Sequence, residues 1–212
     1  MVKRGASPQE AGEQLSAFIQ STVADVASDL LGSLWGRVYL PLILKRRVLL
    51  FGVIDEDAAE RLTEQLLLLD AAASFPITLF INSRGGDFEE TLKIVDTIQH
   101  LESPVDAVVV GNAQSCAFFI LQACRRRVAY PHASFMIHGV SLPDSRIDQT
   151  DFGSIVRGAK DELDTVFEMM AKKSGLSLSR IQKLSKKEKI LNAEEALSSN
   201  FIDTISKNRQ RP

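Results

Sequence analysis

The sequence predicts an α/β fold in which parallel strands alternate with helices. Four apolar runs typical of strands begin at residues 47, 77, 105 and 133, at spacings of 30, 28 and 28 residues. A segment predicted to be helical separates each successive pair of runs. Strand–helix units of similar length indicate parallel strands joined by crossover connections. Hydrophobic residues make up 45% of the 212 residues, which is enough to build one sizeable core.

The strand–helix units follow one another without a long break. Asp55 directly precedes the first helix and is suited to cap it, because its carboxylate can accept hydrogen bonds from free N–H groups of the first turn. In the second helix, apolar residues between Leu92 and Leu101 fall on one face. The expected elements are strand 47–54, helix 56–74, strand 77–82, helix 88–101, strand 105–111, helix 116–124 and strand 133–138.

The second half of the chain begins with a long helix. Apolar residues recur at helical spacing over residues 152–172, and Gly175 can end the helix in a left-handed conformation. A short helix or turn is expected at 176–187. Asn192 is suited to be the N-cap of another short helix. The segment 207–212 is polar, so we interpret it as a C-terminal tail.

Residues 1–37 differ from the rest of the chain. The stretch SAFIQSTVADVASDLLGSL has apolar residues near helical spacing, which predicts an amphipathic helix. We interpret residues 1–37 as an N-terminal extension or arm, with a segment that binds a partner or lines a pore as the alternative. The main domain is then expected to span residues 38–206.

Composition places limits on the class of protein. A formal net charge of −2 weighs against binding to a polyanion. Cys116 and Cys124 lie in an apolar stretch at a spacing that matches no metal-ligand pattern, so we expect a reducing compartment and no disulfide framework. The N-terminus lacks the apolar core of a secretory signal, and no apolar run reaches the roughly 18 residues of a membrane span. A soluble, cytoplasmic protein is therefore expected.

Ser115 lies where an apolar strand gives way to an apolar helix, in VVVGNAQSCAFF (108–119). At such a junction a hydroxyl is accessible, and N–H groups at the start of the helix face it with a favourable dipole. The stretch therefore predicts a nucleophile, although the G-x-S-x-G elbow is absent. A simple N-cap serine is the alternative.

Two other segments carry residues that suit the same chemistry. Gly85 and Gly86 follow a strand and precede a helix, so an N–H of this turn can pair with the N–H of Cys116 to hold a developing oxyanion. A turn that simply requires glycine is the alternative. His138 ends an apolar strand and can act as a general base, or it is a hydrogen-bonded histidine of the core or its rim.

These segments together resemble the proteolytic subunit of the Clp protease, ClpP. The quoted matches are FINSRGG, GNAQSCAFF, ASFMIHG and the segment from SGLSLSRIQKLSKK to NFIDTI, in this order and with similar gaps. The resemblance covers residues 38–206. It implies a ClpP/crotonase-like fold, a spiral of repeated strand–helix units with a protruding handle helix, here 152–172.

The resemblance also implies a serine endopeptidase. Ser115 would be the nucleophile, His138 the general base and Glu188 the third member of the triad, with the N–H groups of Gly86 and Cys116 forming the oxyanion hole. The subunit would assemble with copies of itself or with paralogues into stacked rings around a chamber. An AAA+ unfoldase that uses ATP would feed unfolded polypeptides into it. No cofactor, metal, nucleic acid or membrane is implied for this chain.

The chain departs from the family pattern at several positions. Glu188 stands where the family usually has aspartate, and Asp144, Asp148 and Asp203 have no better claim to that role. Without the resemblance, Glu188 would be interpreted as a solvated charge. Other departures from the usual residues are Arg84, Cys116, Ala117, Lys186 and Lys187.

The departures motivate alternatives to an active peptidase. A catalytically weak or inactive subunit that assembles with active paralogues is the principal alternative. A crotonase-type enzyme acting on acyl-CoA would share the fold and the oxyanion pair. Cys116 as the nucleophile is a further alternative, since a helix N-terminus lowers the pKa of a thiol.

Overall fold

The computed structural model describes residues 34–138 and 152–207. The chain divides into two compact units, residues 1–45 and 46–212. In the first unit the described element is α2 (Leu34–Ile43). The amphipathic helix expected in residues 16–34 lies outside the described residues except for its last position. No helix in the described ranges has the length and apolar character that a bilayer crossing requires.

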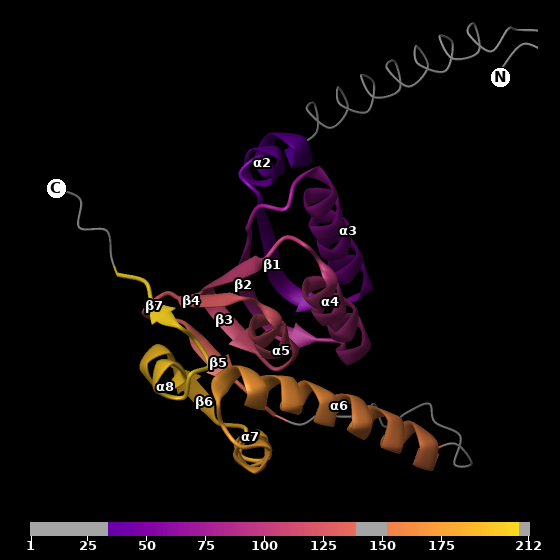
Figure 1. Cartoon of the computed structure of the whole chain (residues 1–212), viewed down its shortest axis with the longest axis vertical. Helices are drawn as coiled ribbons and strands as arrows, with labels where there is room; N and C mark the ends of the chain where they lie inside the picture. The colour runs from indigo at the N-terminus through magenta and orange to yellow at the C-terminus, as the bar shows by residue number, and fades with distance from the viewer. Residues whose placement is uncertain (1–33, 139–151, 208–212) are drawn as a thin grey trace, which may run out of the picture. The chain divides into compact units, whose positions relative to one another are not determined.

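The second unit is built on a mixed sheet, which Figure 1 shows with its helices. Neighbouring strands are parallel throughout except for β5 and β6, and β5 extends the sheet beside β3 beyond the end of β4. The main path runs β1-β2-β3-β4-β7. The described strands are β1 (Arg47–Ile54), β2 (Ile77–Gly86), β3 (Val105–Gln114), β4 (Arg126–Ala129), β5 (Ser134–Met136), β6 (Ile190–Asn192) and β7 (Thr204–Ile205).

The helices match the expected ones closely. Asp55 caps α3 by accepting from the Ala58 N–H at 2.9 Å, and Asn192 caps α8 in a capping box with Glu195. Gly175 has φ 73° directly after α6. The described helices of this unit are α3 (Glu56–Ala72), α4 (Phe88–His100), α5 (Cys116–Ala123), α6 (Phe152–Ser174), α7 (Leu178–Ser185) and α8 (Ala193–Ser198).

The core lies between one face of the sheet and the helices. Alternate residues of β2, from Ile77 to Gly85, are buried, as expected for a strand with one covered face. Helix α5 is buried from Cys116 to Gln122 and packs against α4, α6, β2 and β3. The ring of Phe118 makes edge-to-face contacts with Phe135 and Phe201. The start of α5 is therefore held rigidly beside the ends of β2 and β3.

Strands β2 and β3 continue past the ends expected from sequence. The turn predicted at SRGGD is the last part of β2, because Gly85 and Gly86 still pair with Val53 and Ile54 of β1. The β2–β3 register shifts between Ile81 and Ser83, which leaves extra residues on β3. Such an irregularity bends a strand, so it changes the direction of β3 just before Ser115.

Candidate active site

Ser115 lies at the sharp junction between β3 and α5. Its φ of 53° and ψ of −128° are uncommon for a residue with a side chain, and such strain is concentrated at functional sites. The Ser115 N–H donates to the carbonyl oxygen of Met136 at 2.8 Å, which ties the junction to β5. The residue occupies the N-cap position of α5, but its side chain makes no capping hydrogen bond.

The Ser115 hydroxyl is paired with a histidine instead. Its Oγ lies 2.6 Å from Nε2 of His138, which follows β5 and is half-buried. When the ring proton is on Nδ1, Nε2 accepts the hydroxyl proton. This is the distance that proton transfer from a nucleophile to a general base requires. The structure therefore brings together the two residues that the sequence analysis nominated from separate segments.

The end of β2 lies directly against Ser115. Gly85 has φ 102°, and a Cβ at Gly85 would be 2.7 Å from Ser115 Cβ and 3.0 Å from Cys116 N. A Cβ at Gly86 would be 2.1 Å from the carbonyl oxygen of Ile54. Both positions need glycine, because the backbone approaches its neighbours too closely for a side chain. Gly85 and Gly86 are the last two residues of β2, and we keep the name glycine turn for them below.

Hydrogen bonds fix the glycine turn from both sides. The Gly85 N–H donates to Ser83 Oγ at 3.0 Å, and the Asp87 N–H donates to the Ile54 carbonyl at 2.7 Å. The thiol of Cys116 lies 3.2 Å from the Gly86 carbonyl oxygen. Ser83 was not singled out from sequence. The one feature of the sequence that could have drawn attention to Ser83 is its position two residues before Gly85 and Gly86.

Cys116 contributes its backbone to the site. As the first residue of α5, its N–H has no acceptor within the helix. The residue is 4% exposed and its thiol lies against the Gly86 carbonyl, so the thiol has little access to a substrate. This geometry argues against Cys116 as the nucleophile.

Glu188 does not reach the histidine in this structure. It is exposed, has φ 47°, and has no hydrogen bond or ion pair to His138 among the residues that the structure describes. The antiparallel pairing of β5 with β6 places Met136 opposite Ile190. The pairing ends at these residues, and Glu188 lies in a turn two residues before β6 begins, with its side chain exposed to solvent.

The aspartates considered for the same role lie elsewhere. Asp203 is paired with Arg127, with Oδ1 at 2.6 Å from Nη2 and Oδ2 accepting from the Arg127 N–H at 2.6 Å. Burial by itself raises the pKa of the Asp203 carboxyl, but hydrogen bonds from Arg127 hold the pKa below its usual range. Asp144 and Asp148 lie outside the described residues.

Comparison of the sequence with models of known protein families shows the family of this chain. The model described as Clp protease matches residues 32–209. The chain belongs to the Clp protease family. The ATP-dependent Clp protease proteolytic subunit 3 of Synechococcus sp. (strain CC9902) is 34% identical over 174 residues, or 81% of this chain and 87% of the relative. The ATP-dependent Clp protease proteolytic subunit of Streptococcus sanguinis (strain SK36) is 31% identical over 175 residues, or 81% and 89%.

A solved structure supports the same conclusion for the fold. A ClpP1 mutant from Listeria monocytogenes matches with a TM-score of 0.73 and 28% sequence identity, over 81% of this chain and 97% of that one. The predicted α/β fold and the resemblance to the Clp protease proteolytic subunit are confirmed.

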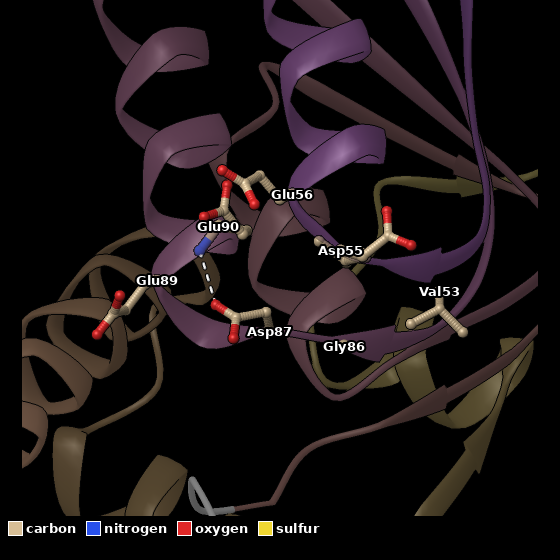
Figure 2. A pocket seen from close by; sticks show the side chains of 8 residues that line it. Val53, Asp55, Glu56, Gly86, Asp87, Glu89 and Glu90 are labelled. Carbon is tan, nitrogen blue, oxygen red and sulfur yellow. Dashed lines mark hydrogen bonds between the residues drawn. The ribbon is translucent and has the colours of Figure 1, made fainter.

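In this Clp protease family member, an acidic pocket of about 560 Å³ opens beside the glycine turn (Figure 2). Asp55 and Asp87 are the N-caps of α3 and α4, and Asp87 accepts from the Glu90 N–H at 3.0 Å. Carboxylates are stabilised at helix starts, so two helix N-termini explain the acidic lining. The lining residues are Val53, Ile54, Asp55, Glu56, Gly86, Asp87, Glu89 and Glu90.

No group of three or more His, Cys, Asp and Glu side chains in residues 34–138 and 152–207 is arranged to hold a metal ion.

Three of the residues that differ from the usual family pattern are exposed, namely Arg84, Lys186 and Lys187. Their charges therefore lie in solvent, and none of these side chains fills the space between Ser115 and His138.

Proposed function

We propose that this chain is an active serine endopeptidase subunit in which Ser115 is the nucleophile and His138 the general base. The 2.6 Å contact between Ser115 Oγ and His138 Nε2 is the observation that carries the proposal. The strained backbone of Ser115 and the close approach of Gly85 support it, because both are expected where a nucleophile must face an oxyanion site.

The mechanism is acyl transfer. Ser115 Oγ attacks the carbonyl carbon of the peptide bond while its proton passes to His138 Nε2. The N–H groups of Gly86 and Cys116 stabilise the oxyanion, and the leaving amine takes the proton from His138. A water molecule then gives a proton to His138 and attacks the acyl carbonyl carbon. As the bond from that carbon to Ser115 Oγ breaks, His138 returns the proton to Oγ and the acid is released.

We further propose that the subunit works inside a ring-shaped chamber made of its own copies or of paralogues. Large apolar side chains of α3 and β1 are exposed in the single chain, including Leu68 at 63% and Val53 at 66%. Apolar surface of this kind is typical of an interface. The relatives are named ATP-dependent, so we propose that a partner AAA+ unfoldase uses ATP and delivers unfolded polypeptides. Residues 1–37 are proposed to be an N-terminal extension or arm.

Hydrolysis of a short fluorogenic peptide tests this proposal without the unfoldase. We expect turnover by wild type in a large particle sized by light scattering, and none by Ser115→Ala in a particle of the same size. Equal turnover by the two proteins would contradict the proposal. A monodisperse monomer at micromolar concentration would contradict the chamber.

The exposed position of Glu188 favours a second candidate function. A histidine without an orienting carboxylate is a weaker base, so the chain would then be a structural or regulatory subunit that assembles with active paralogues. A defined mixed complex with an active subunit, together with no turnover by this chain alone, would support that function.

Replacing Glu188 by glutamine measures the contribution of its carboxylate. We propose that Glu188 orients His138 during turnover, so Glu188→Gln is expected to lower kcat by about 10- to 100-fold. The expected loss is smaller than the ~10⁴-fold drop for the amide variant of a buried triad aspartate, because water screens an exposed carboxylate. Peptide hydrolysis by Glu194→Gln, which changes another exposed acid nearby, is the control. Equal rates in the two variants would identify Glu188 as a solvated charge only.

A further inference from the structure

Four polar side chains connect β2, β3 and β5 directly beside the Ser115 junction. They are half-buried, and none belongs to the triad or to the oxyanion hole proposed above. We call them the amide–serine network, and its members are Asn82, Asn112, Gln114 and Ser134.

The network begins at the irregularity between β2 and β3. Asn82 Oδ1 accepts from the backbone N–H of Asn112 at 3.0 Å and from Asn112 Nδ2 at 3.3 Å. A Cβ at Gly111 would lie 2.4 Å from Asn82 Oδ1, so glycine is required there for the amide to fit. The side chain of Asn82 thus replaces a backbone partner that the shifted register does not supply.

The network then joins β3 to β5. Gln114 Nε2 donates to Ser134 Oγ at 2.8 Å, and Ser134 Oγ donates to Asn112 Oδ1 at 2.9 Å. A longer contact of 3.3 Å from Gln114 Nε2 to Asn112 Oδ1 closes the triangle. The donors and acceptors of the three side chains therefore fit one arrangement of the two strands.

The register of β5 against β3 decides the distance between Ser115 and His138. Strand β5 has only three residues, and β3 ends one residue before Ser115. His138 lies two residues after β5 ends. A slip of one residue between the strands would move His138 by about 3.3 Å and turn alternate side chains to the other face. A contact of 2.6 Å between Ser115 Oγ and His138 Nε2 would not survive that slip.

We propose that the amide–serine network is a positioning device that fixes the register of β5, and therefore of His138, against β3 and Ser115. The inference rests on the proposed function, because its consequence is the reactivity of Ser115. It assigns Ser134 and Gln114 a role in catalysis through His138, without contact with the substrate.

The second-order rate constant for phosphonylation of Ser115 by a fluorophosphonate probe tests the inference. Ser134→Ala removes the central hydroxyl and is expected to lower this constant by about 10- to 100-fold, since a shift of about 1 Å in a catalytic group has effects of that size. Ser134→Thr keeps the hydroxyl and is expected to stay within about 2-fold of wild type. Particle mass and Tm are measured on every variant.

Two further variants keep the test decisive. Gln114→Met keeps the length of the side chain but cannot donate, so it should slow phosphonylation as Ser134→Ala does. Ser198→Ala removes a local hydrogen bond to Glu195 on α8 and should leave the rate unchanged. Rates within about 2-fold of wild type in both Ser134→Ala and Gln114→Met would overturn the inference. Loss of the folded particle in both would also overturn it, because the network would then be a stability element.

The outcomes separate the inference from the proposed function. A wild-type protein that does not react at Ser115 would contradict the proposed function itself. A reactive wild type with equally reactive network variants would contradict only the positioning role.

Discussion

Gly85→Ala is expected to reduce the reaction of Ser115 with an acylating or phosphonylating probe by about 100-fold or more, the effect of losing one oxyanion-hole donor. The new Cβ would lie 2.7 Å from Ser115 Cβ and 3.0 Å from both Cys116 N and Gln114 O. Two of these atoms are backbone and cannot rotate away. The turn must therefore move, and the Gly86 N–H moves with it.

Gly175→Ala is the matched control for this variant. Gly175 also has a left-handed backbone, with φ 73°, but a Cβ there would meet no atom within 4 Å. Both variants therefore introduce left-handed strain of about 1–2 kcal/mol, while only Gly85→Ala adds a clash at the site. Similar probe reaction in the two variants would show that the approach of Gly85 to Ser115 has no catalytic role.

Asp203→Asn is expected to destabilise the protein by about 3 kcal/mol, because it leaves the Arg127 guanidinium buried without a charged partner. The Arg127 side chain is 3% exposed and also donates to Gln122 Oε1 at 2.7 Å. Water reaches Asp203, which is 38% exposed, so we place the effect at the lower end of the range for buried pairs. The measurement is Tm, with an expected fall of about 6–12 °C for a chain of this length.

Asp106→Asn is the control, since Asp106 forms a bidentate pair with Arg125, whose side chain is 53% exposed. Its effect should stay within about 1 kcal/mol. Equal losses of Tm in the two variants would contradict the assignment of Arg127 as a buried cation that needs its partner.

The Asp203 pair also predicts a pH dependence. The pKa of Asp203 is lowered in the folded protein from its ordinary value of 3.8, through hydrogen bonds from Arg127 that outweigh burial. The stabilisation is therefore complete above about pH 4 and is lost as the pH falls through the folded-state pKa. The difference in Tm between wild type and Asp203→Asn should shrink as the pH is lowered below 4.

Hydrophobic periodicity was sufficient to predict most of the fold. Apolar runs of strand length and apolar residues at helical spacing predicted β1 to β3 and α3 to α6, although β2 and β3 end at Gly86 and Gln114 and not at the expected residues 82 and 111. Strand β4 was missed because it is short and begins RRVA. Its second residue, Arg127, is buried, whereas buried strand positions are usually apolar. Asp203, which is distant in the sequence, supplies the charged partner that makes this burial possible.

The contact between Ser115 and His138 could be predicted from the sequence, whereas the amide–serine network beside it could not. Ser115 and His138 lie at strand ends, where parallel strands bring functional side chains to one edge, and their segments also resemble a known family. The amide–serine network depends on a register shift between β2 and β3, and no pattern in the sequence predicts that shift. The exposure of Glu188 in the turn before β6 was one of two alternatives left open by the sequence, because residue type alone does not say whether a carboxylate contacts His138 or lies in solvent.

Intact-mass spectrometry after treatment with a fluorophosphonate probe tests the central claim most directly. We expect a single adduct on wild type, located at Ser115 by peptide mapping, and no adduct on Ser115→Ala. His138→Gln should form the adduct at least about 100-fold more slowly, because it removes the general base. An adduct of equal yield on Ser115→Ala, or none on a wild-type protein that has assembled into a large particle, would contradict the assignment of Ser115 as the nucleophile of an active peptidase.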